Sequence, residues 1–481
     1  MLRVIQDIYH NNKARILLGK YLSPEFSISS GVMQGSKLGP ILFIIFINDL
    51  LETLNDSGLG ANIESLIISC LGFADDIVLT SDCPKKMQKL IDICFQWAQQ
   101  NHMKFNSDKC KVMVLNKPWK SISFTLNNKI LDIVKSYKYL GITFANRRLT
   151  SLYTEYFALM LEKANRRLQC IKHYGFHKDG LRPETAIKMY KLLVRPILEY
   201  GAQVLIFNHH YLSPKTIKNR VLNRTSDFVE KIEHFQNQAL KSLLGCPKSS
   251  SPAVVRLFSG VESMVSRIDL LQLRYFWKLS RSDENNIAHT VFNLRKKRFL
   301  ATKKGFLHEI FNLCCKYDIV NLWHGNLQTA LNPKSFLKQK VLAFNFREDF
   351  EVGRNKSCGF VDVYLKNSYF DLEGYQLVQP FKQFDFFASA KARSLIIKVL
   401  LYPRVFKVDC KLCSNGFKNI FDHYVHNCNY VRTQRKRLRN ILIFYNFSKE
   451  YISNKRMFLL SCLEKRSWTK RLTSFLEEVG Y

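Results

Sequence analysis

The sequence predicts an α+β fold in which a mixed region of strands and helices precedes a mostly helical region and a small C-terminal metal-binding knuckle. Three observations lead to this prediction. Short apolar runs separated by polar turns fill the segment Leu2 to Phe144, and such runs are typical of strands and hairpins. From Leu152 onward the apolar residues recur at helical spacing. Cys410 and Cys413 then open a cluster of potential zinc ligands.

The first element is a glycine-rich loop, Gly31 to Pro40, which precedes the apolar stretch Ile41 to Ile47. Glycine lets a backbone approach a ligand closely. The side-chain amide of Gln34 can both donate and accept hydrogen bonds, which suits a base or a sugar edge. Pro40 fits the first turn of a helix. Taken singly, the pattern also fits a loop that only starts a core helix.

The second element is the tetrapeptide Phe73-Ala74-Asp75-Asp76. It lies between the apolar runs Leu66 to Leu71 and Ile77 to Leu79, which predict two short buried strands with the acidic pair at the tip of a hairpin. Carboxylates are costly to hold near a hydrophobic sheet unless a positive charge joins them. Magnesium favours one or two carboxylates together with substrate phosphates, so the pair suggests metal-assisted nucleotidyl transfer. The alternative is a solvated Asp-Asp turn.

Two further turns complete the first region. Asn106 to Lys111 leads into the apolar run Val112 to Leu115, so Lys109 stands at the entrance to a strand. A lysine there can donate a proton or pair with phosphate, and an exposed lysine at a strand end is the alternative. Further on, the tripeptide Tyr139-Leu140-Gly141 also suits an ordinary hairpin turn.

In this order, the four elements resemble the palm of a reverse transcriptase, with the closest likeness to the non-LTR (LINE-type) retrotransposon polymerases. Gly31 to Pro40 is similar to the loop that positions template and nucleotide, motif B. Phe73 to Asp76 is similar to the catalytic hairpin, motif C. Asn106 to Lys111 is similar to motif D, and Tyr139 to Gly141 is similar to the primer grip, motif E. The ordered set is far more specific than any one member.

The resemblance implies a partial right-hand polymerase palm and two-metal, RNA-directed DNA synthesis, with an RNA template and a DNA primer as partners. Asp75 would hold magnesium, Asp76 would assist, and Lys109 would protonate the leaving pyrophosphate. The residues implied to bind substrate are Gln34 and Gly35, for nucleotide and template, and Tyr139, Leu140 and Gly141, for the primer end.

The family's first catalytic aspartate, in motif A, lies on a strand upstream of motif B. The segment Leu2 to Ser30 resembles the helix and hairpin that follow that strand, and Asp7 lies in a helical pattern that makes it a poor substitute. A two-metal mechanism needs carboxylates from both strands. We therefore expect a truncated copy whose polymerisation is impaired alone. The alternative is a non-catalytic nucleic-acid-binding remnant, and a partner chain that supplies the missing half stays open.

The helical region resembles the thumb and connector of the same polymerases. The apolar face of its first helix is predicted to contain Tyr156, Leu159, Met160, Ala164, Leu168 and Ile171. Its opposite face carries charges, among them Arg166 and Arg167, which suit either duplex contact or plain solvation. Gln236 to Gly245 and Val265 to Leu279 continue the helical pattern. Pro247 to Pro252 is a Ser/Pro-rich break and a possible linker.

The C-terminal cluster predicts a structural zinc site. A Cys-x2-Cys turn at Cys410 and Cys413 presents two thiolates, and a later histidine and Cys428 complete a tetrahedral set. His426 competes with His423, and we prefer His423 because His-x4-Cys matches the family's CCHC pattern. An accidental cluster is the alternative. The basic residues that follow suit single-stranded or structured RNA: Arg432, Arg435, Lys436, Arg437 and Arg439.

Composition indicates a folded, nucleic-acid-binding protein. Hydrophobic residues make up 47% of the chain and aromatic residues 13%, which excludes a disordered protein. The formal net charge is +34 and is spread along the chain, so it predicts a general attraction to polyanions that weakens with salt. An anionic membrane surface and plain solubility are the alternatives. No basic amphipathic helix of convincing length supports the membrane, and Ile41 to Ile47 is too short to span a bilayer.

Cellular location and domain organisation follow from the remaining features. The N-terminus has no secretory signal pattern, and the 13 cysteines show no disulfide framework, so we expect an intracellular protein of the nucleus or cytoplasm. We divide the chain into a palm at 1–145, a thumb-like helical region at 146–250, a helical connector of unknown role at 251–400, a zinc knuckle with a basic helix at 401–445 and a tail at 446–481.

Overall fold

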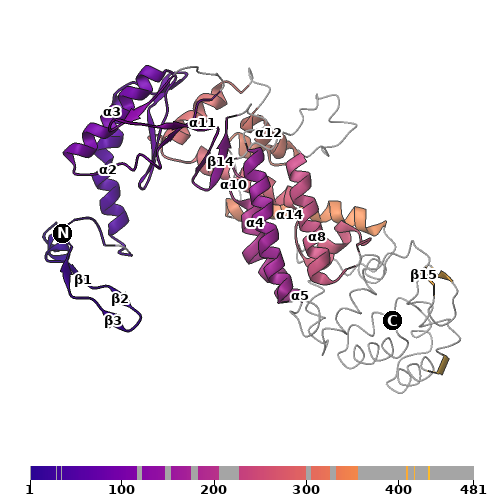
Figure 1. Ribbon diagram of the computed structural model, residues 1–481. Coiled ribbons are helices and arrows are strands. Elements are labelled where there is room, and N and C mark those ends of the chain that lie inside the picture. Colours follow the sequence, from indigo (N-terminus) through magenta and orange to yellow (C-terminus); the bar gives the residue numbers. More distant parts are fainter. Residues whose placement is uncertain are drawn as a thin grey trace. The chain divides into compact units, whose positions relative to one another are not determined.

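A computed structural model of the chain gives its fold (Figure 1). The structure describes residues 2–28, 30–33, 35–115, 122–146, 153–174, 183–204, 227–246, 248–299, 305–325, 332–355, 408–409, 416–417 and 432–433. The chain separates into two compact units, residues 1–137 and 138–481. The first combines helices with short paired strands, and the described part of the second is mostly helical. This mixture confirms the predicted α+β class.

The first unit begins with a helix and two small hairpins. Helix α1 (Leu2–Tyr9) precedes β1 (Lys13–Ala14), which pairs with β4 (Phe26–Ser27). Between them, β2 (Leu17–Leu18) pairs with β3 (Tyr21–Leu22). All four residues of the inner pair are exposed, although three of them are apolar and one is tyrosine. The hairpins therefore rest on backbone pairing more than on side-chain burial.

The core of the first unit lies between two long helices. Helix α2 (Gly39–Asp56) carries Pro40 in its first turn, as predicted, because a proline there removes no intrahelical hydrogen bond. Its buried stripe of Ile47, Leu50 and Leu54 recurs at helical spacing. This stripe packs against helix α3 (Pro84–Gln100) through Leu90, Cys94, Trp97 and Ala98.

Two antiparallel hairpins connect α2 to α3. The first pairs β5 (Ala61–Ile63) with β6 (Leu66–Ile68). The second pairs β7 (Cys70–Phe73) with β8 (Asp76–Leu79), with Phe73 opposite Asp76. Gly72 lets β7 approach α2, since a Cβ at this position would lie 3.0 Å from Cδ1 of Leu51. The predicted acidic hairpin is thereby confirmed and rests on α2.

The prediction that these strands are buried was wrong in part. Cys70 is buried, but its neighbour Leu71, which belongs to the same predicted run, is exposed. The reason is that a β7–β8 pair has two faces, and only one of them packs on the helices. Apolar composition alone does not distinguish a strand covered on one face from a strand covered on both.

The first unit ends in a second small core. β9 (Lys111–Val112) runs parallel to β12 (Asp132–Ile133), and β10 (Thr125–Leu126) pairs with β11 (Lys129–Ile130). Phe124, Leu126 and Leu131 pack against Ile91 of α3. Lys109 precedes β9, as predicted.

The second unit opens with a hairpin and a long helix. β13 (Ser136–Tyr139), whose first residues close the first unit, pairs with β14 (Ile142–Ala145). Helix α4 (Thr154–His173) follows and contacts β14. The predicted apolar stripe is buried except for Leu159, which is 46% exposed. Met160, Ala164 and Leu168 follow Tyr156 in four-residue steps, and Ile171 comes three residues later. Leu159 lies about 100° around the helix from Met160, so its inclusion was wrong.

A continuous helical segment with one widened turn packs against α4. It consists of α5 (Pro183–Met189), the π-helical turn η2 (Tyr190–Val194) and α6 (Arg195–Glu199). The backbone N–H of Arg195 donates to the carbonyl of Tyr190, which is the five-residue spacing of a π-turn. Helix α8 (Asp227–Leu244) contacts both α4 and α5, and the buried Tyr190 hydroxyl donates to Oε1 of Gln236 on α8 at 2.9 Å.

The remaining described helices belong to the second unit, where they pack around a separate core. They are α9 (Pro252–Ser259), α10 (Met264–Ser280), α11 (Ile287–Lys297), α12 (Phe306–Lys316), α13 (Val320–Trp323) and α14 (Pro333–Arg354). Phe276 of α10 stacks on Trp323 of α13 at a centroid distance of 5.5 Å. The aromatic residues Phe276 and Trp323 therefore help to fill this core.

Helix α9 ties this core to the helices before it. It contacts α8 on one side and α14 on the other, so the possible linker at Pro247 to Pro252 connects two helices that pack on each other. Ser250 is buried there, and the Lys241 ammonium donates to the carbonyl of Lys248 at 2.8 Å. Among the described residues, no helix is long and apolar enough to cross a membrane.

Candidate active site

The tip of the β7–β8 hairpin carries the acidic pair. Phe73 and Asp76 are paired across the strands, so Ala74 and Asp75 form a two-residue loop. Ala74 has φ of 53°, in the left-handed region that a side chain disfavours. This backbone puts both aspartates at the outer end of the hairpin, where they are exposed.

The two carboxylates lie without a compensating cation in the described part of the chain, where neither has a hydrogen bond or ion pair from another side chain. Adjacent uncompensated carboxylates at an exposed tip suit a hard, oxygen-ligated cation such as Mg²⁺. The described residues bring no third His, Cys, Asp or Glu into a cluster with this pair. The magnesium role of Asp75 and Asp76 stays a prediction.

The predicted nucleotide-positioning loop precedes α2. Gly31 has φ of 87° and Gly35 has φ of 85°, so both adopt the left-handed backbone for which glycine is suited. Gly39 is buried at the start of α2, where a Cβ would lie 3.1 Å from the carbonyl oxygen of Met33. The loop therefore folds closely over the first turn of the helix. Gln34 lies outside the described residues.

Lys109 sits in an exposed turn whose shape is set by Asn106. The Asn106 side-chain oxygen accepts from the backbone N–H of Asp108 at 3.0 Å and from that of Lys109 at 3.3 Å. This is the local side-chain capping expected of asparagine in a turn. Within the described residues, no hydrogen bond or ion pair links Lys109 to Asp75 or Asp76. Its acid role stays a prediction.

The predicted primer-grip turn lies at the tip of the β13–β14 hairpin. Leu140 has φ of 45° and Gly141 has φ of 83°, the pair of positive angles required by a type I′ turn. The hydroxyl of Tyr200 donates to the carbonyl of Leu140 at 2.6 Å. A Cβ at Gly141 would lie 3.0 Å from Cε1 of Tyr200. The turn is thus held by a side chain from the end of α6.

A second tyrosine extends this contact into the helices. Tyr156, buried on α4, donates its hydroxyl to the backbone carbonyl of Tyr200 at 2.6 Å. Burial raises the pKa of Tyr156 to about 12, with a further contribution from Tyr200, so the hydroxyl stays protonated and remains a donor at neutral pH. Sequence reasoning gave neither tyrosine this role. The only indication in the sequence that this turn needs a supporting contact is Leu140, a bulky residue at a turn position that requires a left-handed backbone.

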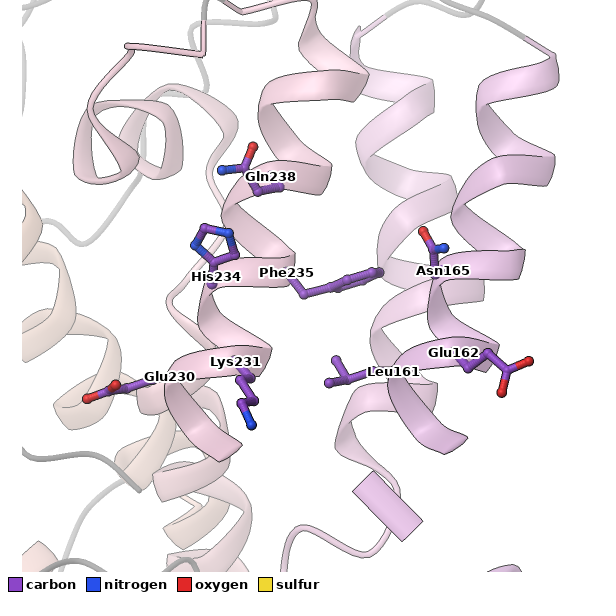
Figure 2. A pocket seen from close by; sticks show the side chains of 8 residues that line it. All are labelled: Leu161, Glu162, Asn165, Glu230, Lys231, His234, Phe235 and Gln238. Atoms are coloured by element: carbon purple, nitrogen blue, oxygen red, sulfur yellow. The ribbon is translucent and has the colours of Figure 1, made fainter. Parts of the chain in front are cut away.

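Helices α4 and α8 border an open groove of about 820 Å³ (Figure 2). Leu161 and Phe235 point toward each other across it, whereas Glu162 and Glu230 point away. The charged residues of its rim have both signs: Glu162, Glu230 and Lys231. On α4, Arg166 pairs with Glu162 at 3.5 Å and both are exposed. Duplex contact by this helix stays a prediction.

The predicted zinc ligands Cys410, Cys413, His423 and Cys428 lie outside the described residues, as does the competing His426. The described strands on either side of the first two ligands do pair. β15 (Val408–Asp409) is antiparallel to β16 (Gly416–Phe417), with Asp409 opposite Gly416. The segment that contains both cysteines therefore connects two hydrogen-bonded strands.

Comparison with known proteins identifies the family of the first region. The sequence profile of the family described as "Reverse transcriptase (RNA-dependent DNA polymerase)" matches residues 3–144. This range contains all four elements that carried the resemblance. Two of these elements are the acidic hairpin tip and the Leu140-Gly141 turn.

The curated relatives are polymerases of retrotransposable elements. The chain is 25% identical over 232 residues to the RNA-directed DNA polymerase from mobile element jockey of Drosophila melanogaster, covering 46% of this chain and 25% of that protein. It is 30% identical over 215 residues to the Pol polyprotein from type-1 retrotransposable element R2 of Popillia japonica, covering 42% and 32%. The alignments thus span about a quarter to a third of these relatives.

Proposed function

Residues 3–144 belong to the reverse transcriptase family and resemble its non-LTR branch, and from this premise we propose that the chain acts in RNA-directed DNA synthesis. The observation that carries the proposal is the acidic hairpin tip. Asp75 and Asp76 lie exposed at the outer end of β7–β8, without a compensating cation among the described residues, inside the segment that matches the family. A pair left in this way is suited to receive a metal ion and a nucleotide.

Each residue of the site has a part in the proposal. Asp75 holds Mg²⁺ and Asp76 assists it through the adjacent carboxylate. Bound magnesium supplies Lewis-acid stabilisation of the phosphoryl oxygens. Lys109, exposed in its turn, gives a proton to the leaving pyrophosphate. The remaining residues bind substrate: Gln34 and Gly35 position nucleotide and template, and Tyr139, Leu140 and Gly141 hold the primer end.

The charge of the chain supports the nucleic-acid partners. A net charge of +34 attracts an RNA template and a DNA primer. Because such binding releases counterions from the phosphates, affinity is expected to fall steeply as salt rises.

Primer extension tests the proposal. The chain is given Mg²⁺, deoxynucleotides and a DNA primer annealed to RNA, with Asp75→Asn as the test variant. Asp82→Asn is the matched control, since Asp82 is also exposed and pairs with Lys86 four residues further along the chain. We expect Asp75→Asn to lower extension at least about 100-fold, whereas Asp82→Asn leaves it unchanged.

The same assay separates catalysis from binding. If the chain extends no primer yet binds the RNA–DNA duplex in a salt-sensitive manner, the catalytic proposal fails and the chain is a nucleic-acid-binding protein. If it extends the primer and Asp75→Asn extends it equally well, the assignment of the acidic tip is wrong.

We also propose a structural zinc ion held by Cys410, Cys413, His423 and Cys428. The pairing of β15 with β16 supports it, because a hairpin brings the two ends of a Cys-x2-Cys turn together. One zinc per chain is expected by elemental analysis, with loss of the metal in the double variant Cys410→Ser, Cys413→Ser. The control is Cys170→Ser at an exposed cysteine of α4. Equal zinc in all three proteins would refute the site.

A further inference from the structure

The turn at the tip of β13–β14 holds a residue in an unfavourable conformation. A type I′ turn favours Asn-Gly, Asp-Gly or Gly-Gly because both central residues need positive φ. Here the first central residue is Leu140, a bulky side chain with φ of 45°. Such a backbone persists only when its surroundings hold it.

Tyr200 makes two contacts that do so. Its hydroxyl donates to the Leu140 carbonyl at 2.6 Å, which fixes the orientation of the peptide after the strained residue. Its ring lies so close to Gly141 that a Cβ there would be 3.0 Å from Cε1. The hydrogen bond and the ring contact act on the two central residues of the turn at once.

Tyr200 is itself fixed on both sides. Its carbonyl accepts the hydroxyl of the buried Tyr156 at 2.6 Å. The residue before it, Glu199, accepts from Nε of Arg267 at 2.6 Å and pairs with Nε of Arg195 at 3.2 Å. These side chains are mostly buried, where a hydrogen-bonded charge pair is held firmly. The turn is therefore connected through Tyr200 to helices α4, α6 and α10.

We propose that Tyr200 is a positioning residue, which sets the position of the Tyr139–Gly141 turn relative to the α4 and α6 helices and thereby the place where a primer 3′ end is held. The inference rests on the proposed function, since it assigns that turn to the primer. Tyr200 is 53% exposed, so water can replace its hydroxyl at the Leu140 carbonyl. Removal of the hydroxyl should therefore spare the fold and change the position of the turn.

The test uses Tyr200→Phe, which removes only the hydroxyl, and measures binding without polymerisation. Two ligands of equal length are compared by fluorescence anisotropy: an RNA–DNA duplex with a recessed DNA 3′ end, and a blunt duplex. We expect Tyr200→Phe to weaken binding of the recessed end about fivefold, as for one lost hydrogen bond, and to leave the blunt duplex unchanged. Tyr156→Phe should act in the same direction with a smaller effect. Tyr174→Phe is the control, since Tyr174 is an exposed tyrosine at the end of α4.

Each outcome decides the matter. Equal weakening for both ligands would make Tyr200 a general structural residue and overturn the proposal, as would unchanged binding of both. A wild-type chain that does not prefer the recessed end would also overturn it. If the chain prefers that end and Tyr200→Phe removes the preference, positioning holds even where primer extension fails, so this result stands apart from the catalytic test of Asp75.

Discussion

The hairpin tip at Ala74-Asp75 and the hairpin tip at Leu140-Gly141 have the same length, and each puts a non-glycine residue in the left-handed region. They differ in their supports. In the described part of the chain, no side chain hydrogen bonds to the first tip, whereas Tyr200 holds the second. The difference suggests two tasks: the first tip is left open to receive ligands, and the second is held in place.

The two units that carry these tips also differ in how far their charged side chains are buried. In the first, Lys111 pairs at 2.6 Å with Asp132, whose side chain is 72% exposed. In the second, Arg256 of α9 donates through Nε to Asp349 of α14 at 2.8 Å and through an Nη to Glu233 of α8 at 2.8 Å. The Glu233 carboxylate also accepts from the first backbone N–H of α10 at 2.6 Å. One buried guanidinium therefore connects several helices.

The largest expected effect comes from removing that guanidinium. Arg256→Met should lower the free energy of unfolding by about 3–5 kcal/mol, because the two carboxylates remain buried without a counter-charge. Burial already raises the pKa of both Glu233 and Asp349. A raised folded-state pKa favours the protonated form, so the loss should shrink as pH falls toward 5. Urea denaturation measures it.

The matched control for this substitution is Arg166→Met. Arg166 lies on α4 in an exposed pair with Glu162, so its loss should leave the unfolding transition nearly unchanged. Comparable losses at the two arginines would remove the distinction between buried and exposed charges on which the comparison of the units rests.

The second largest effect is expected at the Leu140-Gly141 tip, which Tyr200 contacts. Gly141→Ala should cost about 2 kcal/mol, since alanine is strained at positive φ and its Cβ would press on the Tyr200 ring. Gly325→Ala is the control, because Gly325 has φ of 79° in the same unit with open space around a Cβ. The difference between the two variants in thermal unfolding reports the ring contact. Equal losses would show that Tyr200 does not restrict the turn.

A smaller effect, of opposite sign, is expected at the open tip. Ala74→Gly should raise the free energy of unfolding by about 0.5 kcal/mol, because relief of the left-handed strain slightly exceeds the greater entropy of an unfolded glycine. Chemical denaturation of both proteins measures the change. A marked destabilisation would indicate that the Ala74 methyl group packs on something, and that the first tip is supported after all.

The smallest effect is expected at the exposed ion pair. A hydrogen bond from Lys111 lowers the pKa of the Asp132 carboxyl. A lowered folded-state pKa adds stability above the ordinary aspartate pKa, and this is lost as pH falls through the lowered value. Asp132→Asn should therefore cost little at neutral pH, less in high salt, and nothing in strong acid. A salt-independent cost would contradict the exposed character of this pair.

Local elements were predictable from the sequence, and contacts between distant residues were not. The acidic hairpin, the start of α2 at Pro40 and the turn before β9 depend on neighbours within a few positions. The bond from Tyr200 to Leu140 joins residues 60 positions apart. The link from Arg256 to Asp349 spans 93. A single sequence contains no periodicity that selects such pairs.

The exposure of apolar side chains was the other property that the sequence did not predict correctly. Leu71 and Leu159 are apolar and were predicted to be buried, yet both are exposed. Their residue types are compatible with a core, and only the arrangement of the other elements determines which face of a strand or helix is covered. The turns that carry the candidate site residues were thus predictable, and the side-chain contacts that support those turns were not.

The π-turn η2 has a consequence for how this protein tolerates insertions and deletions. Tyr190 to Val194 form five-residue hydrogen-bonded spacing between two ordinary helical segments. A π-turn holds one extra residue within a single wider turn, so the helix after it keeps nearly the angular phase of a regular α-helix that is one residue shorter. Deletion of one residue there should therefore restore a regular α-helix and leave Tyr200 beside Leu140. Deletion of one residue from α6 would instead rotate everything after it by about 100°, so Tyr200 would face away from Leu140 although every side chain of the contact was still present.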